Sequence, residues 1–239
     1  MGLGLGSDGL ELDVRFSSDG VVVVNHDSTL DRTTNVHGKV CSFTADELAR
    51  ADAGYHFHAE KGWPLRGQGI GVPTLGSVLA RYPATRVIIE LKLNHPELAA
   101  AVVEVVRQAD AVDRVCIGSF GLRVLRAVRE LEPAIATSAA RKEVRWALYR
   151  SRCRWPVSRV SYCGYQVPEI AGATRVVSPR FVADADQAGL PVQVWTVDNA
   201  HDASRLLEWG VDALITDRPD RIVPIVRQDT EALVSRRPS

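Results

Sequence analysis

No stretch of this sequence is apolar for long enough to cross a membrane, since none approaches the roughly 18 to 20 consecutive residues that a bilayer span needs. Met1 is also not followed by the charged and apolar segments of a secretory signal peptide. We therefore expect a protein without a transmembrane segment and without an export signal.

An excess of charge is missing as well. Lys plus Arg and Asp plus Glu each number 29, which gives a formal net charge of zero. This balance predicts no broad basic face for nucleic acid or anionic lipid, although local patches remain compatible with it. We expect no nucleic-acid partner, and a phosphate-bearing ligand would have to be held by a built site.

Cysteine is scarce, and its four copies form no CxxC pair. Cys116 lies inside an apolar run, where a free thiol behaves as a small buried hydrophobic group. The others are Cys41, Cys153 and Cys163. We interpret all four as reduced thiols and predict a cytoplasmic protein.

The sequence does contain a regular alternation of two kinds of segment. Runs rich in Val, Ile and Leu, typical of strands, fall at 10–14, 87–92, 115–120, 135–138, 160–167, 192–197 and 213–216. Stretches with helical periodicity lie between them, among them 96–110, 122–131 and 201–210. Strands that alternate with helices predict a parallel sheet, and seven such strands in 239 residues predict an α/β fold of the TIM (β/α)₈ barrel type.

A complete barrel has eight such units in roughly 250 residues, so one unit is missing from this count. After the last strand, 219–227 predicts a short final helix and 228–239 a polar tail. The opening GLGLGSDG resembles the end of a helix and the turn into a strand, with no strand before it. We therefore expect a single barrel domain over 1–227 that lacks its first βα unit, followed by the tail over 228–239.

One insertion breaks this rhythm. A hairpin signal, SSDG, follows the first strand, VVVV and NHDSTLDRTT come next, and a polar, glycine-rich stretch over 35–71 completes this long excursion. Barrel enzymes keep active-site loops in such excursions at strand ends. The segment 141–156 is basic and aromatic, and we interpret it as a helix with a solvated face.

The first strand carries two carboxylates on one face. Side chains alternate along a strand, so Glu11 and Asp13 point to one side and the aliphatic neighbours to the other. Like charges this close repel unless a cation neutralises them, and carboxylate oxygens suit Mg²⁺, Ca²⁺ or Mn²⁺. The structural alternative is a pair of buried ion pairs with arginines such as Arg15 or Arg32.

A second strand repeats the pattern, because Glu90 and Lys92 share a face at its C-terminal end. These two side chains could simply pair with each other. Beside Glu11 and Asp13 on the neighbouring strand, however, Glu90 becomes a candidate third oxygen ligand for a cation. Lys92 would then supply a point charge for an anionic substrate.

Three further side chains are candidates for a role in a site. His26 lies beside Asp27, where a lone histidine is more often a surface or capping residue, but imidazole suits proton transfer near neutral pH. Trp195 on a late strand is either core packing or the wall of a pocket. We interpret Asp217 as the cap of the helix that Pro219 begins.

The run DGLELDVRFSSDGVVVVNHDSTLDRTT resembles the glycerophosphodiester phosphodiesterase family. The later segments VPTL, IIELK, SF, VQVWTVD and GVDALITDRPD follow in that family's order and approximate spacing, from about Gly6 to Arg221 in all. The resemblance implies a TIM barrel that hydrolyses glycerophosphodiesters, as small-molecule substrates, to glycerol 3-phosphate and an alcohol. It also implies a divalent metal, Ca²⁺ or Mg²⁺, and two histidines that act as general acid and base.

The resemblance assigns roles to residues that match the family's motifs. The implied metal ligands are Glu11, Asp13 and Glu90. The implied catalytic residues are His26, as one of the two histidines, and Lys92, as a phosphate contact. Phe120 and Trp195 are implied to line the substrate site.

The sequence also departs from the family's pattern. Members begin with a strand that ends in a His-Arg-Gly motif, followed by a Pro-Glu-Asn motif, and this sequence has neither. One hypothesis is an active enzyme whose native chain starts further upstream. The other is a shortened, catalytically impaired module that binds a phosphodiester or a metal.

Physical reasoning favours the first hypothesis, because a barrel that lacks a strand exposes unpaired sheet edges. A truly short chain would need a partner or a homo-oligomer to cover the gap. A phosphate-binding barrel isomerase is disfavoured, because no glycine-rich phosphate loop precedes the last helix.

Overall fold

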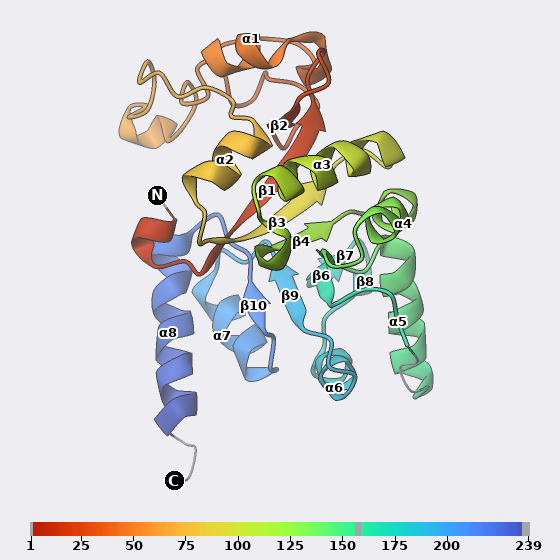
Figure 1. Ribbon diagram of the computed structural model, residues 1–239. Helices are drawn as coiled ribbons and strands as arrows, with labels where there is room; N and C mark the ends of the chain where they lie inside the picture. The colour runs from red at the N-terminus through yellow and green to blue at the C-terminus, as the bar shows by residue number, and fades with distance from the viewer. Residues whose placement is uncertain (1, 156–158, 236–239) are drawn as a thin grey trace. The chain divides into compact units, whose positions relative to one another are not determined.

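The computed structural model describes residues 2–155 and 159–235 (Figure 1). The chain divides into two compact units. We call Glu11–Ala136 the N-terminal unit, and Met1–Leu10 together with Thr137–Ser239 the C-terminal unit. Each unit has strands, helices and a cluster of buried apolar side chains of its own.

A five-stranded sheet organises the N-terminal unit. The strands are β1 (Gly9–Phe16), β2 (Val22–Val24), β3 (Arg86–Leu91), β4 (Val115–Gly118) and β5 (Ala136–Thr137). They are hydrogen-bonded in the order β2-β1-β3-β4-β5. β2 runs antiparallel to β1, which confirms the predicted hairpin, whereas β3 and β4 are parallel, with Glu90 opposite Gly118.

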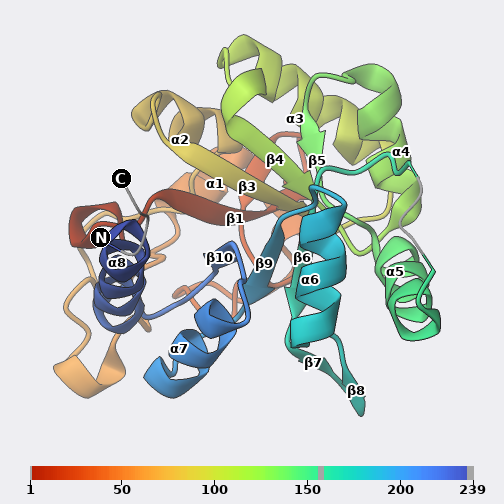
Figure 2. The ribbon, with the colours of Figure 1, turned by 90° about the horizontal axis from the view of Figure 1, so that it is seen from below.

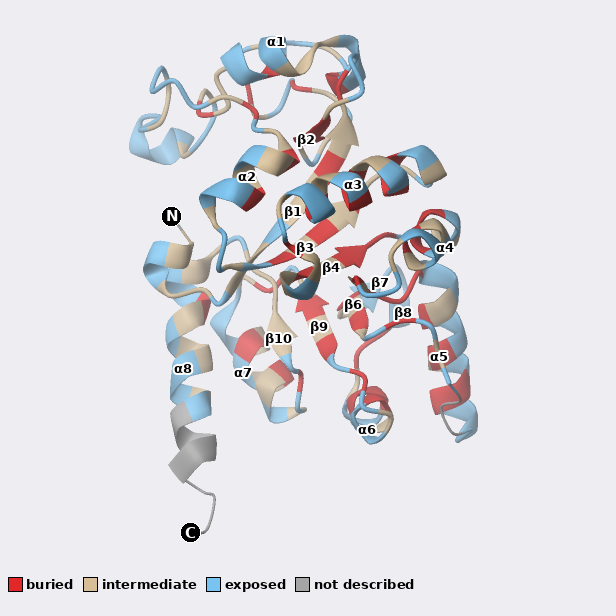
Figure 3. Ribbon diagram, viewed as in Figure 1, coloured by how far each residue is buried: buried red, intermediate tan, exposed pale blue. Residues whose placement is uncertain are grey.

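Burial alternates along β3 as the sequence predicts. Val87, Ile89 and Leu91 are buried, whereas Ile88 and Glu90 between them are partly exposed. Figure 3 shows buried positions along β3 and β4. The aliphatic side of the sheet is covered by helices, and Figure 2 shows α2 and α3 along one side of it.

The covering helices are α2 (Leu75–Arg81), α3 (Pro96–Gln108) and α4 (Leu122–Leu131), and the last two confirm the predicted helices at 96–110 and 122–131. Thr74 accepts the backbone N–H of Ser77 and so caps the start of α2. Arg114 caps its other end from a distant part of the chain. Its guanidinium donates to the carbonyl oxygens of Leu79, Tyr82 and Thr85, at 3.0, 3.1 and 3.0 Å.

The predicted excursion contains the short helix α1 (Ala45–Arg50) and helical turns at Val40–Ser42 and Ala59–Lys61. α1 starts with a capping box between Thr44 and Glu47. The excursion has a small core of its own, made of Val23, Leu30, Val40, Leu48 and Val72. Gly71 lies so close to α1 that a Cβ there would be 1.9 Å from the carbonyl oxygen of Ala49, which only glycine avoids.

The C-terminal unit contains a three-stranded parallel sheet in the order β10-β9-β6. Its strands are β6 (Tyr165–Pro168), β9 (Val192–Trp195) and β10 (Ala213–Leu214), and a separate hairpin joins β7 (Ile170–Ala171) to β8 (Thr174–Arg175). The helices are α5 (Arg141–Cys153), α6 (Pro179–Gln187), α7 (Ala200–Glu208) and α8 (Pro219–Ser235), and the turn Leu3–Leu5 precedes β1. The buried core includes Tyr165, Phe181, Val194, Leu206 and Ile222.

All seven predicted strands are present, as β1, β3, β4, β5, β6, β9 and β10. The predicted final helix is too short, because α8 continues past residue 227 to Ser235 with Pro224 inside it. The β7–β8 hairpin is not predicted, since two-residue strands leave no periodicity to read. Pro156, the predicted end of the basic helix, and residues 236–239 of the predicted tail lie outside the described residues.

No helix within residues 2–155 and 159–235 has both the length and the apolar character of a membrane-spanning segment.

Candidate active site

The two carboxylates of β1 lie on the side of the strand opposite Val14, as alternation predicts. Val14 is fully buried, whereas Glu11 is exposed. Asp13 Oδ1 lies 2.6 Å from Lys92 Nζ, and the side chains of this pair are only 14% and 17% exposed. The backbone N–H of Lys92 also donates to the carbonyl of Val14, at 3.4 Å, which holds the end of β3 beside β1.

The two arginines named in the structural alternative make other contacts, besides the electrostatic interaction of Arg15 with Asp13. Arg15 donates from Nε and Nη2 to the carbonyl oxygen of His26, at 3.1 and 2.8 Å. Arg32 Nε donates to Asp27 Oδ2 at 2.6 Å. Asp13 pairs with Lys92 at the end of the neighbouring strand.

Glu90 stands on β3 among other charged groups. Burial raises the pKa of Glu90 to about 7, the nearby Lys92 opposes this increase, and the negative charges of Glu11 and Asp13 add to it. The backbone N–H of Phe120, just after β4, also acts on this carboxyl group and lowers its pKa. The structure thus brings together the predicted set from adjacent strands, with Phe120 beside it.

The carboxylates of this set are also the candidate metal ligands. Within residues 2–155 and 159–235, no three His, Cys, Asp or Glu side chains converge closely enough to surround an ion. The donor chemistry does fit a hard divalent cation, because Ca²⁺ and Mg²⁺ prefer carboxylate oxygens. A cation would also relieve the repulsion that Glu11 and Asp13 exert on Glu90.

His26 follows β2 and is held from two directions. Its side chain is 61% exposed, and its Nδ1 lies 2.7 Å from Asp27 Oδ1. Arg32 and His26 both donate to Asp27, which lowers the pKa of that carboxyl group to about 2. Because the ionised Asp27 can only accept, Nδ1 carries the proton and Nε2 is left as the basic nitrogen.

The position of His26 relative to the carboxylates follows from the backbone. The N–H of Asn25 donates to the carbonyl oxygen of Asp13 at 2.9 Å, so His26 follows a residue that is bonded to the carboxylate strand. The role of Asp27 was missed by sequence reasoning, which treated it only as a neighbour of His26. The available signal was the positive charge of Arg32, which follows Asp27 by five residues in the same loop.

Trp195 ends β9 in the C-terminal unit. It is partly exposed and lines a pocket of about 580 Å³, together with Glu169, Asp198, Asn199 and Asp202 among others. Trp195 therefore lies on the wall of a pocket in the C-terminal unit, and its contact with substrate stays a prediction.

The prediction for Asp217 is wrong. The carbonyl of Arg218 accepts the first helical hydrogen bond of α8, from Ile222 at 3.1 Å, so the cap position is one residue later. Arg218 pairs there with Asp220 in the first turn, Nη2 to Oδ2 at 2.7 Å. Asp217 instead donates its backbone N–H to Asp198 Oδ1, which also accepts from the hydroxyl of Thr216.

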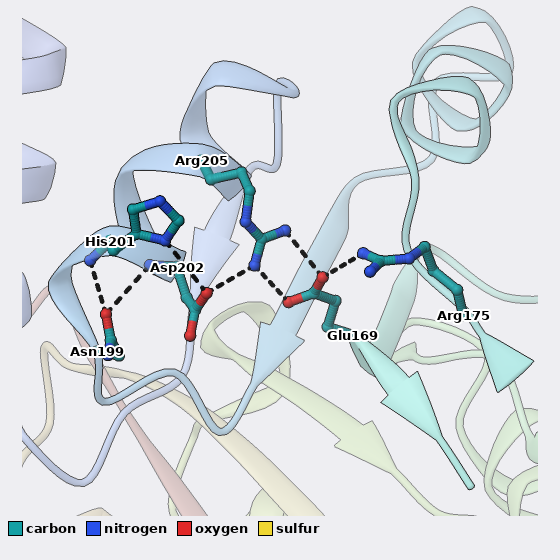
Figure 4. A network of polar contacts seen from close by, with 6 residues as sticks. All are labelled: Glu169, Arg175, Asn199, His201, Asp202 and Arg205. Atoms are coloured by element: carbon teal, nitrogen blue, oxygen red, sulfur yellow. Dashed lines mark hydrogen bonds and ion pairs between the residues drawn. The ribbon is translucent and has the colours of Figure 1, made fainter. Parts of the chain in front are cut away.

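The pocket beside Trp195 is lined in part by a network of charged residues that the sequence analysis does not predict (Figure 4). Arg205 donates to both oxygens of Glu169 at 2.8 Å and to Asp202 Oδ1 at 2.8 Å. Arg175 reaches Glu169 from the hairpin at 2.5 Å. Donation by Arg205 and Arg175 lowers the pKa of Glu169, so this carboxylate acts as a fixed, ionised support.

Comparisons with known proteins identify the family of this chain. Residues 1–221 match the model of the Glycerophosphoryl diester phosphodiesterase family. A glycerophosphodiester phosphodiesterase of Caldanaerobacter subterraneus is 30% identical over 239 residues, which cover 94% of this chain and 88% of the relative. Another, of Bacillus altitudinis, is 32% identical over 226 residues, covering 92% and 86%.

Solved structures agree as well. The glycerophosphodiester phosphodiesterase of Agrobacterium tumefaciens has a TM-score of 0.72 at 27% identity, and the match covers 92% of this chain and 88% of that one. An Oleispira antarctica phosphodiesterase, solved in complex with the product sn-glycerol-3-phosphate, has a TM-score of 0.73 at 26% identity, with 94% and 87% covered. The predicted fold class and the resemblance of the motifs are thereby confirmed. The chain belongs to the glycerophosphoryl diester phosphodiesterase family, with the α/β fold of the TIM-barrel type, and is a hydrolase of that family.

Proposed function

We propose that this protein hydrolyses glycerophosphodiesters to glycerol 3-phosphate and an alcohol, and that it uses a divalent cation, Ca²⁺ or Mg²⁺. The observation that carries the proposal is the group of three carboxylates on β1 and β3 with one partly buried lysine just after β3, namely Glu11, Asp13, Glu90 and Lys92. The product bound to the Oleispira antarctica relative supports the product class. We also propose a cytoplasmic location.

Glu11, Asp13 and Glu90 are the residues that would hold the cation. When bound there, it would polarise the phosphoryl oxygens and offset the charge that develops in the transition state. Lys92, anchored by Asp13, places a fixed positive charge where the phosphate would lie.

His26 would move a proton to or from the reacting oxygens through Nε2, because Asp27 holds Nδ1. Phe120 is 46% exposed beside Glu90 and offers an apolar contact to the substrate. Trp195 is proposed as a second substrate contact, supported by its place on the wall of a pocket.

The test is the release of glycerol 3-phosphate from glycerophosphocholine and glycerophosphoethanolamine by the purified chain, before and after chelation. We expect EDTA to abolish turnover and either Ca²⁺ or Mg²⁺ to restore it. Calorimetric titration should show that Glu11→Ala and Glu90→Ala lose affinity for the restoring cation. Glu130→Ala, an exposed carboxylate on α4, is the control and should retain it.

The alternative is a catalytically impaired module that binds a phosphodiester or a metal without turning it over. The ion pair of Lys92 with Asp13, which engages two site residues with each other, is the observation that favours it. Cation or diester binding without any release of glycerol 3-phosphate would select this alternative. Cation affinity that Glu11→Ala and Glu90→Ala leave unchanged would refute the metal site.

A further inference from the structure

Helix α5 presents two different faces, as Figure 3 shows by its buried and exposed positions. Val144, Ala147 and Ser151 are buried, and the first two belong to the core of the C-terminal unit. The opposite face is exposed at Lys142, Arg145, Trp146, Tyr149 and Arg152, which recur at helical spacing. This exposed stripe combines cations with large aromatic side chains.

The aromatic side chains form one cluster, which we call the aromatic cluster: Trp146, Tyr149 and Trp155. They are 52%, 50% and 54% exposed. The rings of Trp146 and Tyr149 stack with centroids 5.5 Å apart, and Trp155 packs edgewise on Tyr149 at 5.8 Å. Scattered surface aromatics need no explanation, but a contiguous exposed cluster marks a place where another surface binds.

The backbone at the end of α5 maintains this cluster. Arg154 takes a left-handed conformation, with φ of 56°, and the N–H of Trp155 donates to the carbonyl of Arg150 at 3.0 Å. This turn returns Trp155 onto the side of the helix. Glycine is the usual residue in this left-handed conformation, because a side chain disfavours it. The packing of Trp155 on Tyr149 that this turn produces is nevertheless exposed to solvent.

The charged residues that are exposed within 141–155 all carry a positive charge. Arg141, Lys142, Arg145, Arg152 and Arg154 are exposed, whereas the one acid between 141 and 155, Glu143, is partly buried and accepts the N–H of Ala140 at 2.7 Å. Lys142, Arg145 and Trp146 line an open hollow of about 370 Å³. In a chain with a net charge of zero, this is a concentrated cationic face with aromatic rings inside it.

We propose that this face of α5 docks on an anionic lipid surface. Trp and Tyr favour the boundary between acyl chains and water, and cations of a partly apolar helix are attracted by anionic headgroups. The hollow beside Trp146 suits a phosphate headgroup. A second copy of the chain fits less well, because two cationic faces would repel each other. Single-stranded nucleic acid also fits less well, because its bases stack on separate aromatic rings, whereas these rings pack on each other.

The experiment is co-sedimentation of the full chain with vesicles of phosphatidylcholine, with and without phosphatidylglycerol. We expect binding only to the anionic vesicles, weakened by salt. Lys142→Gln/Arg145→Gln should reduce the affinity by about fivefold for each cation removed. Trp146→Ser/Trp155→Ser should reduce it by about tenfold or more, because apolar burial in the interface is lost.

Arg123→Gln/Arg126→Gln is the matched control. It removes two exposed arginines at the same spacing from α4, and it should leave vesicle binding unchanged. Thermal unfolding of all three variants should stay at the wild-type temperature, which shows that a lost affinity is not a lost fold. The readout does not depend on turnover, so the proposed hydrolysis can fail while this proposal stands.

Several results would overturn the proposal. One is a wild-type chain that does not sediment with anionic vesicles, and another is an equal loss of binding in the α4 control. A concentration-dependent dimer that the aromatic variant abolishes would assign the face to a second copy. Retention by a single-stranded oligonucleotide, but not by vesicles, would assign it to nucleic acid.

Discussion

Asp27 holds His26 on one side and accepts from Arg32 on the other, so it fixes both the ring orientation and the protonated nitrogen of the proposed proton carrier. We predict that Asp27→Asn lowers kcat by about tenfold to a hundredfold, because the amide can present a donor to Nδ1 and favour the wrong tautomer. KM should change little, since Asp27 is not proposed to touch substrate. Steady-state kinetics over a range of pH would measure both effects.

A matched pair in the same excursion supplies the control. Asp31 holds the exposed His37 in the same way, with Nδ1 to Oδ1 at 3.1 Å. Asp31→Asn should leave kcat unchanged. Equal losses of kcat in the two variants would mean that Asp27 acts on the stability of the excursion and not on His26.

At the scale of the residue, strand periodicity is what allows the sequence to predict on which face of its strand each candidate side chain lies. Alternation alone brings Glu11, Asp13 and Glu90 to one side of two adjacent strands. It does not say which cation pairs with which carboxylate, because that depends on how strands align across the sheet. Lys92 therefore forms its ion pair with Asp13 on β1, although Glu90 is nearer in sequence.

At the scale of the element, the close packing of the end of the excursion against α1 depends on one glycine. We predict that Gly71→Ala destabilises the protein by about 2 kcal/mol or more, since its Cβ would meet the carbonyl oxygen of Ala49. Gly76→Ala in α2 is the control, because the nearest atom to its Cβ, on Val105, is 3.7 Å away. That variant should gain about 0.5–1 kcal/mol from helix propensity, and urea unfolding would measure both.

Elements with strong periodicity were predictable, and elements held by distant contacts were not. The α3 and α4 segments have a continuous apolar stripe, and both ends of α4 were predicted correctly. α8 continues beyond Pro224 to Ser235, although a proline inside a helix usually ends or kinks it. The β7–β8 hairpin includes an ion pair between Arg175 and Glu169, and no local sequence pattern predicts that pairing.

For the molecule as a whole, Glu90 should make stability depend on pH when no cation is bound. The folded state keeps this proton at pH values where the unfolded chain has lost it, so stability should fall as pH rises from about 4.5 to 7 and then level off. The fall amounts to at most about 3 kcal/mol, since one pK unit is about 1.4 kcal/mol. Glu90→Gln should remove it, as measured by thermal unfolding in EDTA.

A divalent cation should reverse that dependence. It binds the ionised carboxylates, so Ca²⁺ or Mg²⁺ should raise the unfolding temperature more at about pH 8 than at about pH 5. Glu90→Gln should lose most of this gain. An identical gain at both pH values, or one that survives in Glu90→Gln, would place the cation elsewhere in the molecule.

The net charge of zero hides how unevenly charge is distributed over the chain. The balance of 29 acids and 29 bases predicts no basic face for lipid or nucleic acid, and a global count can say no more. The basic segment near 141–156 was predicted as a solvated helix, and α5 is that helix over Arg141–Cys153. The packing of Trp155 against the side of α5 is not predictable from the sequence, because it depends on a left-handed turn at Arg154.

The reach of Arg114 to the end of α2 bears on the order in which the N-terminal unit folds. The last carbonyl groups of α2 receive their partner only after the chain has passed through β3 and α3. α2 should therefore fray at its C-terminal turn until the strand that follows Arg114 has docked. Amide protons of that turn and of β4 should become protected from exchange in one cooperative step, although they are separated in sequence.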